Sequence, residues 1–127
     1  MTDQSIEQEI QANGLTAPRV TPADIEANIA SEHYFTAAQG DAKAQEDAAF
    51  ANGAINGEQS RPVPQALGLL TICVLVLRNG FTVTGESACA SPENFNADIG
   101  RKVARAAAVA KVWPLMGYEL RSKLAAG

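Results

Sequence analysis

The sequence predicts an α+β protein in which a central antiparallel β-hairpin is packed by two C-terminal helices, with short N-terminal helices before it. Two observations predict this fold class. A long apolar run and a strictly alternating run flank Asn79-Gly80, which is the pattern of a hairpin. Ser91-Pro92 then combines a capping residue with proline at the first helical position. The 127 residues have the length of a single domain, 1–127.

The hairpin is expected to have strands at about 68–77 and 81–87. Asn-Gly favours a two-residue type I′ turn, and this turn would place Arg78 opposite Phe81 and Val76 opposite Val83. The first strand is apolar on both of its faces, so it needs cover on both. It therefore meets either a third strand or a partner subunit, and we expect a homodimer or a higher homo-oligomer.

Two helices are predicted after the hairpin, at about 92–111 and 114–125. Trp113-Pro114 is expected to separate them, because proline breaks a helix interior. An apolar stripe is expected to face the core from the first of these helices, formed by Phe95, Ile99, Val103, Ala106 and Ala110.

The N-terminal half has weaker secondary-structure signals than the C-terminal half. Residues 1–20 form an acidic extension with a short helix at 5–11, and Thr21-Pro22-Ala23-Asp24 begins a second helix of about ten residues. That helix runs into His33, Tyr34 and Phe35. We interpret Tyr34 and Phe35 as an anchor on the sheet and His33 as a surface group; the alternative is an aromatic lid or base-stacking platform. Residues 41–61 are expected to be a flexible connection with one short helix over 41–50.

Charge is distributed unevenly along the chain. Residues 1–60 have a net charge of −8 and residues 61–127 a net charge of +4. The two halves can attract each other within one chain or between chains. The overall charge of −4 makes nucleic-acid binding by the whole protein unlikely, since the summed field repels phosphates.

No catalytic motif, cofactor motif or metal-ligand spacing is found in the sequence, and we expect no enzyme activity, no cofactor and no metal. Cys73 and Cys89 are expected to be free thiols in a reducing compartment. The polar N-terminus is not a secretory signal, and the apolar run is too short to cross a bilayer. The sequence therefore predicts a cytoplasmic protein with no membrane contact.

The connection after the second strand is the best candidate binding site. It combines small polar side chains with a predicted helix N-terminus, whose free N–H groups suit an anion. The candidate ligand-binding residues are Glu86, Ser87, Ser91, Asn94, Asn96, Arg101 and Arg105. The alternative is a well-capped strand-to-helix connection with a solvated basic face, and the sequence leaves both interpretations open.

The stretch NGFTVTGESACASPENFN, within residues 67–124, resembles a family of small tailed-phage and prophage proteins named for the phages N4 and Sf6. The segment TPADIEANIASEHYFTAAQG, residues 21–40, is similar to that family's N-terminal block. The resemblance implies an accessory role during infection, in the host cytoplasm, and supplies no catalytic residue. By size and architecture the chain is also similar to phage sponges of the Thoeris anti-defence type, which sequester cyclic nucleotide or cyclic ADP-ribose signals.

The leading hypothesis is a non-enzymatic anti-defence protein that sequesters a small anionic nucleotide signal as a homo-oligomer. A second hypothesis is inhibition of a host or defence protein through the acidic N-terminal half. Nucleic-acid binding through the basic C-terminal helices is the third.

Overall fold

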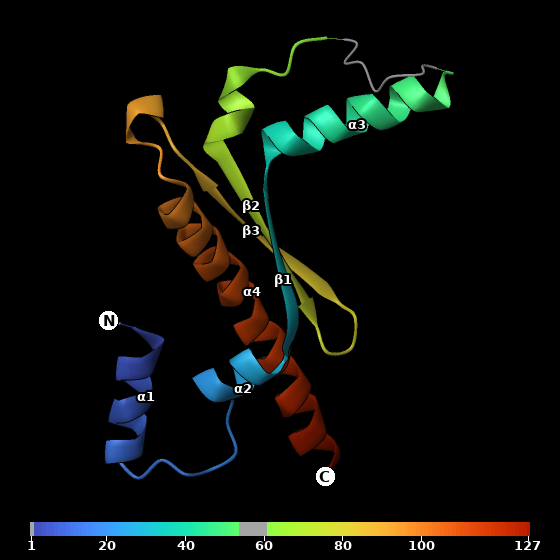
Figure 1. Cartoon of the computed structure of the whole chain (residues 1–127). Helices are drawn as coiled ribbons and strands as arrows, with labels where there is room; N and C mark the ends of the chain where they lie inside the picture. Colours follow the sequence, from blue (N-terminus) through green and yellow to red (C-terminus); the bar gives the residue numbers. More distant parts are fainter. Residues whose placement is uncertain (1, 54–60) are drawn as a thin grey trace.

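An antiparallel sheet of three strands and a long C-terminal helix form the body of the protein (Figure 1). The structure is a computed structural model that describes residues 2–53 and 61–127. The strands are β1 (Ile29–Thr36), β2 (Leu70–Leu77) and β3 (Thr82–Ala88), and the α-helices are α1 (Asp3–Ala12), α2 (Pro22–Ala27), α3 (Ala37–Ala51) and α4 (Ala97–Ala126). Two short 3-10 helices, η1 (Gln65–Leu69) and η2 (Pro92–Asn94), complete these elements. The predicted α+β class and the predicted hairpin strands are confirmed.

The third strand, β1, comes from the same chain and makes β2 the centre of the sheet. The capping box at Thr21 and Asp24 is present, but the predicted ten-residue helix is wrong, because α2 ends at Ala27 with Asn28 as its cap. Residues 29–36 instead pair with β2 along its full length. Both edges of β2 are therefore paired within one chain, which removes the unpaired edge as a reason for oligomerisation.

The turn between β2 and β3 has one residue more than predicted. Leu77 N–H donates to the Phe81 carbonyl at 2.8 Å, so the loop is Arg78-Asn79-Gly80. Gly80 has φ +89°, and no described residue other than glycine has positive φ. A type I′ turn needs positive φ at both central positions, so the type I′ prediction is wrong and the geometry is that of a three-residue loop. Consequently Val83 pairs with Leu75, and not with Val76 as predicted.

The C-terminal region is one helix rather than the predicted two. It begins at Ala97, where the Asn96 side chain caps it by accepting from Ile99 N–H, and Pro114 lies inside it. Proline at this position removes the hydrogen bond to the Ala110 carbonyl. Ala110 and Pro114 are both exposed, so water can satisfy that carbonyl and the helix continues.

α4 packs on the sheet through small residues. Its buried positions are Gly100, Ala104, Ala108 and Val112. A Cβ added to Gly85 of β3 would lie 2.1 Å from the Ala104 carbonyl oxygen, so helix and strand backbones are in direct contact there. The predicted core stripe is wrong, since Ile99 and Val103 on that stripe are 59% and 48% exposed. The buried face of α4 consists mainly of small side chains, because only these allow the helix and strand backbones to approach so closely.

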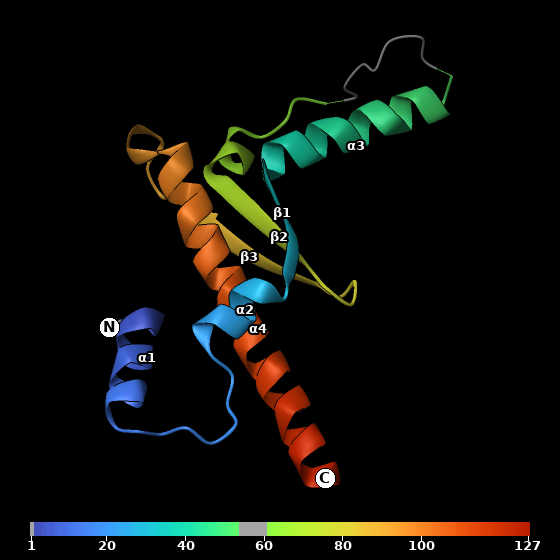
Figure 2. The same ribbon diagram turned by 60° about the horizontal axis from the view of Figure 1, so that its bottom comes forward.

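α3 and α1 lie at the margins of the molecule. α3 follows β1 directly and projects from the end of the sheet, away from the side that α4 covers (Figures 1 and 2). It includes the predicted helix at 41–50. Residues 54–60 of the predicted connection lie outside the described residues, and its flexibility stays a prediction. α1 includes the predicted helix at 5–11. Within the described residues, no helix is long and apolar enough to span a membrane.

Candidate functional site

Arg105 joins three elements on the side of α4 that faces β1. Its Nη2 lies 2.7 Å from Glu26 Oε2 in α2 and 3.0 Å from Glu32 Oε2 in β1. Its Nε donates to both carboxylate oxygens of Glu32 at 3.1 Å. The guanidinium is therefore held by two carboxylates, in the geometry that favours strong charge-assisted hydrogen bonds.

Tyr34 extends this network toward the sheet. Its hydroxyl donates to Glu32 Oε1 at 2.6 Å. The Arg105 guanidinium is the main reason that the pKa of Glu32 lies below its ordinary value, and the Tyr34 hydrogen bond adds to it. Burial, reinforced by the bond to Glu32, raises the pKa of Tyr34. Near neutral pH Glu32 is therefore ionised and Tyr34 is neutral. Neither group changes its protonation state around that pH, so the network keeps the same hydrogen bonds.

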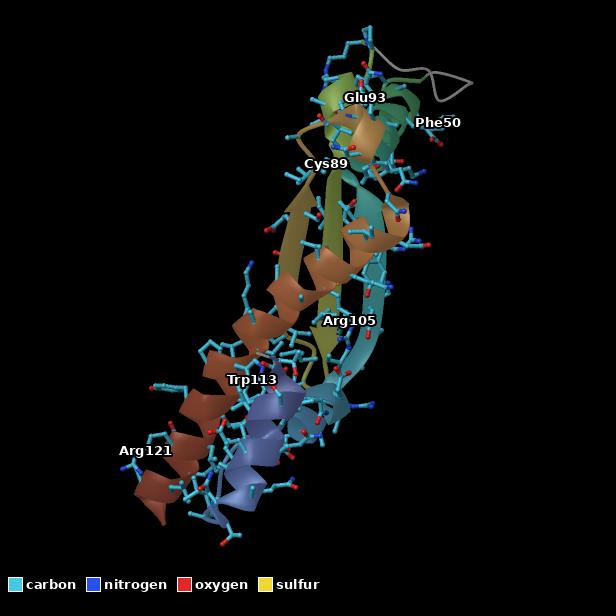
Figure 3. All side chains as sticks on the ribbon, turned by 90° about the vertical axis from the view of Figure 1, so that its left-hand side faces the viewer. Phe50, Cys89, Glu93, Arg105, Trp113 and Arg121 are labelled. Atoms are coloured by element: carbon cyan, nitrogen blue, oxygen red, sulfur yellow. The ribbon has the colours of Figure 1, made fainter. Side chains whose placement is uncertain are left out.

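Three adjoining cavities run along α4 past this network, two of them beside β1 and the third beside α1 and α2, and we call them together the β1–α4 groove. The middle cavity, of about 270 Å³, is lined by Tyr34, Asp98, Arg101, Lys102 and Arg105. It shares Tyr34 and Arg101 with a cavity of about 250 Å³ at one end. It shares Lys102 and Arg105 with a cavity of about 650 Å³ at the other end. Figure 3 shows α4 crossing the sheet, with Arg105 beside β1.

The end of the groove near the start of α4 is aromatic. Three aromatic residues line it together with neutral polar residues and one arginine; the lining residues are Tyr34, Phe35, Thr36, Gln39, Thr71, Phe95, Ala97 and Arg101. The Tyr34 side chain is on the α4 side of β1, whereas Phe35 pairs with Ile72 on the other side. Rings with amide and hydroxyl groups beside them suit a flat heterocycle, which needs both stacking surface and hydrogen-bond partners.

The middle of the groove is cationic at its rim. Arg101 forms an ion pair with Asp98 one turn earlier in α4, and the two side chains are 44% and 78% exposed. No ion pair or hydrogen bond involves Lys102 within the described residues. Exposed ion pairs contribute at most about 1 kcal/mol. Arg101 can therefore exchange Asp98 for another anion at little cost, whereas Arg105 is committed to Glu26 and Glu32.

The structure brings together only part of the predicted binding residues. Arg101 and Arg105 line one cavity. The next cavity is lined by Phe95, but not by its neighbours Asn94 and Asn96. Asn96 uses its side-chain oxygen to cap α4, and the Ser91 carbonyl accepts from the Cys89 thiol at 3.1 Å.

The predicted site residues of β3 lie at the other edge of the sheet. Exposed Glu86 accepts from the Thr84 hydroxyl on the face that α4 does not cover, and half-buried Ser87 pairs with Thr71 of β2. β1 and β3 flank β2 on opposite sides, so Glu86 and Ser87 are separated from the β1–α4 groove by the central strand. Their ligand-binding role stays a prediction, and neither residue lines the β1–α4 groove.

Among the described residues that line the groove there is no cysteine or histidine. In the residues that the structure describes, no group of three or more histidine, cysteine or carboxylate side chains is placed to hold a metal ion. Cys73 is fully buried under the network, and burial raises the pKa of its thiol. His33 lies on the opposite face of β1 from Tyr34, where its ring bonds to the Ser31 hydroxyl at 2.9 Å.

Several groove residues were not among the predicted site residues: Glu26, Glu32, Tyr34, Phe35 and Lys102. The sequence favours Tyr34 and Phe35 as sheet anchors, and Lys102 follows Arg101 directly in the sequence. The partnership of Glu32 with Arg105 spans 73 residues. No local pattern in a single sequence signals a pair so far apart.

Comparison with known proteins identifies the family of the chain. Residues 20–124 match the family described as "Phage protein (N4 Gp49/phage Sf6 gene 66) family". No curated protein and no solved structure matches the chain. The match begins just before α2 and includes every element of the groove except the start of α1. This chain therefore belongs to the phage protein family of N4 Gp49 and Sf6 gene 66.

Proposed function

We propose that this phage protein is a non-enzymatic binding protein that takes up a small anionic nucleotide in the β1–α4 groove and withholds it from the host's defence. The observation that carries the proposal is the continuity of an aromatic cavity with a cationic rim through Tyr34 and Arg101. A nucleotide has the same two parts, a flat base and a phosphate, within one small molecule.

Each part of the groove has a role in this proposal. The rings of Tyr34 and Phe95 provide the stacking surface for the base. Lys102 and Arg101 take the phosphate, because Lys102 has no partner among the described residues and the exposed pair of Arg101 with Asp98 exchanges readily. Arg105 is a positioning residue that holds Glu32 and, through it, Tyr34.

The acidic N-terminal half gives less support to the competing hypothesis of a charge decoy. Much of its charge is engaged inside the chain, in the ion pairs Glu7 with Arg19, Asp41 with Arg61, Glu46 and Asp47 with Lys43, and Glu26 and Glu32 with Arg105. A decoy would have to present these carboxylates to a partner instead.

Calorimetric titration with a panel of cyclic dinucleotides and cyclic ADP-ribose isomers tests the proposal. We expect one ligand class to bind and to raise the melting temperature. Replacing Arg101 by alanine should weaken binding about 10- to 100-fold, the usual effect of losing a hydrogen bond between charged groups. Lys102→Ala should act in the same direction.

Arg121→Ala is the matched control, since this arginine lies in the same helix far from the groove (Figure 3) and loses the same charge. It should leave the affinity unchanged. Absence of heat and an unchanged melting temperature with every ligand would refute the proposal. Equal losses in the Arg101 and Arg121 variants would show that net charge matters and the groove does not.

A further inference from the structure

The face of the sheet turned away from α4 is apolar along its centre. The residues of β2 alternate between the two faces, and Leu70, Ile72, Val74 and Val76 point away from α4 and are only half-buried. We call this surface the open face. Within the described residues no helix lies across it, and α3 meets the sheet only at its end (Figures 1 and 3).

The composition of the open face is that of an interface. Its apolar central row is bordered on β3 by Thr82, Thr84 and Glu86, and on β1 by Ser31, His33 and Phe35. An apolar centre with a mainly polar border is typical of surfaces that associate. If this face met only water, β2 would carry polar residues on it and apolar residues only on the α4 side, as β3 does.

α3 makes the open face one side of a recess. This helix leaves β1 at Thr36 and projects on the open side, and its far end carries Phe50, which is 47% exposed (Figures 2 and 3). Its 15 residues span about 22 Å. Sheets that pack face to face lie about 10 Å apart, so α3 is long enough to reach past a sheet that packs on the open face.

We propose that the open face binds a second copy of this chain, with the two sheets packed face to face and antiparallel about a twofold axis. A twofold axis across the strands at Val74 places the two α3 helices at opposite ends of the paired sheets, where each flanks the partner. Asp41 of α3 is engaged by Arg61, and exposed Glu46 and Asp47 share the single Lys43, so this part of α3 keeps a net negative charge. It would lie beside the β2–β3 turn of the other copy, which presents exposed Arg78.

The available area fits this occupant. Three strands of about eight residues have a flat footprint of roughly 370 Å², and one side of α3 adds roughly 220 Å². The accessible area of a side-chain layer exceeds its flat footprint, which brings the recess close to the 800 Å² or so that each partner contributes to a standard interface. The sheet alone would be too small, so the arrangement requires α3.

This interface is separate from the cationic part of the β1–α4 groove, which lies on the other face of the sheet; only Phe35 and Gln39, at the aromatic end of the groove, lie toward α3. It also differs from the strand-edge association expected from the sequence, because β2 has no free edge. In this dimer the cationic part of each groove is open to solvent, on the outer side of each copy.

The mass in solution tests the inference, by light scattering on a sizing column. The wild-type chain should have twice the monomer mass of 13.3 kDa at micromolar concentration. Val74→Lys places a charge at the twofold axis and should raise the dissociation constant at least about 100-fold. Val103→Lys is the matched control, because Val103 is exposed on the outer side of α4; this variant should remain dimeric.

Thr84→Lys provides a second variant that does not depend on an apolar position. Thr84 is half-buried on an edge strand and already polar, so the fold should accept lysine, as circular dichroism would verify. It should also yield monomers. A monomeric wild-type chain, or a dimer that persists in a folded Thr84→Lys variant, would overturn the inference, and a dimer lost only in Val103→Lys would move the interface to α4.

Discussion

Gly85 determines how α4 sits on the sheet. The two nearest atoms to an added Cβ, at 2.1 Å and 2.3 Å, belong to the backbone of Ala104 and Ala108, and a backbone cannot move aside as a flexible side chain can. The alternation of β3 places Gly85 on the same face as Val83. The sequence does not reveal the helix that lies above this glycine, because the small residues of α4 resemble weak core formers when they are considered alone.

Gly85→Ala should therefore destabilise the protein. The expected loss in free energy of unfolding is about 1–3 kcal/mol or more, the range for overpacking a filled interior, and it is measured by urea denaturation at neutral pH. Gly117→Ala is the control in α4, where nothing lies within 4 Å of the added Cβ; it should gain about 0.5–1 kcal/mol from helix propensity. A Gly85→Ala variant as stable as the wild type would contradict the direct backbone contact.

At the scale of elements, the sequence identified those whose signals are local. The alternation of β3, the capping box of α2 and the glycine at the hairpin turn are each set by neighbouring residues, and all three are present. β1 has no such signal, since Glu32 and His33 interrupt its apolar residues. It is a strand because β2 offers it an edge, and tertiary pairing of this kind overrides local preference.

The Arg105 network holds α2, β1 and α4 together, so its loss should be visible in the pH dependence of stability. The folded protein holds the pKa of Glu32 below the ordinary value of 4.5. A carboxylate of this kind stabilises the fold above that ordinary value, and the stabilisation is lost as the pH falls through the lower folded value. Arg105→Gln should therefore cost stability at pH 7, and the difference from wild type should shrink in acid.

Urea denaturation of both proteins at neutral pH and well below pH 4.5 measures this difference. The ion pairs of Glu7 and Asp41 also respond to acid, but they are intact in both proteins and cancel in the comparison. Arg121→Gln controls for the lost positive charge and should show no such pH dependence. A difference that stays constant with pH would mean that the Arg105 side chain stabilises the fold through packing rather than through its charge.

At the scale of the whole molecule, α1 stands apart from the rest. Residues 1–19 precede the matched family region, and α1 reaches the body through Trp113, whose ring N–H donates to Asp3 Oδ2 at 3.1 Å. A mainly apolar cavity of about 250 Å³ remains between them, lined by Ile6, Ile10, Val20 and Trp113 together with Asp3 and Glu7. The sheet and α4 share a separate core that includes no residue of α1. The body should therefore fold without α1.

Deletion of residues 1–19 should leave the circular dichroism of the body intact and shift the fluorescence of Trp113, the only tryptophan, to longer wavelength, because its ring loses the cover of α1. Asp3→Asn weakens the hydrogen bond but keeps the apolar cover, so it should shift the emission less.

The deletion also removes Asp3 from the wall of the groove beside Lys102 and Arg105. Nucleotide binding should thus persist or strengthen in the truncated chain, whereas inhibition of a partner through the acidic extension would be lost. An unfolded truncated chain would instead make α1 part of the core.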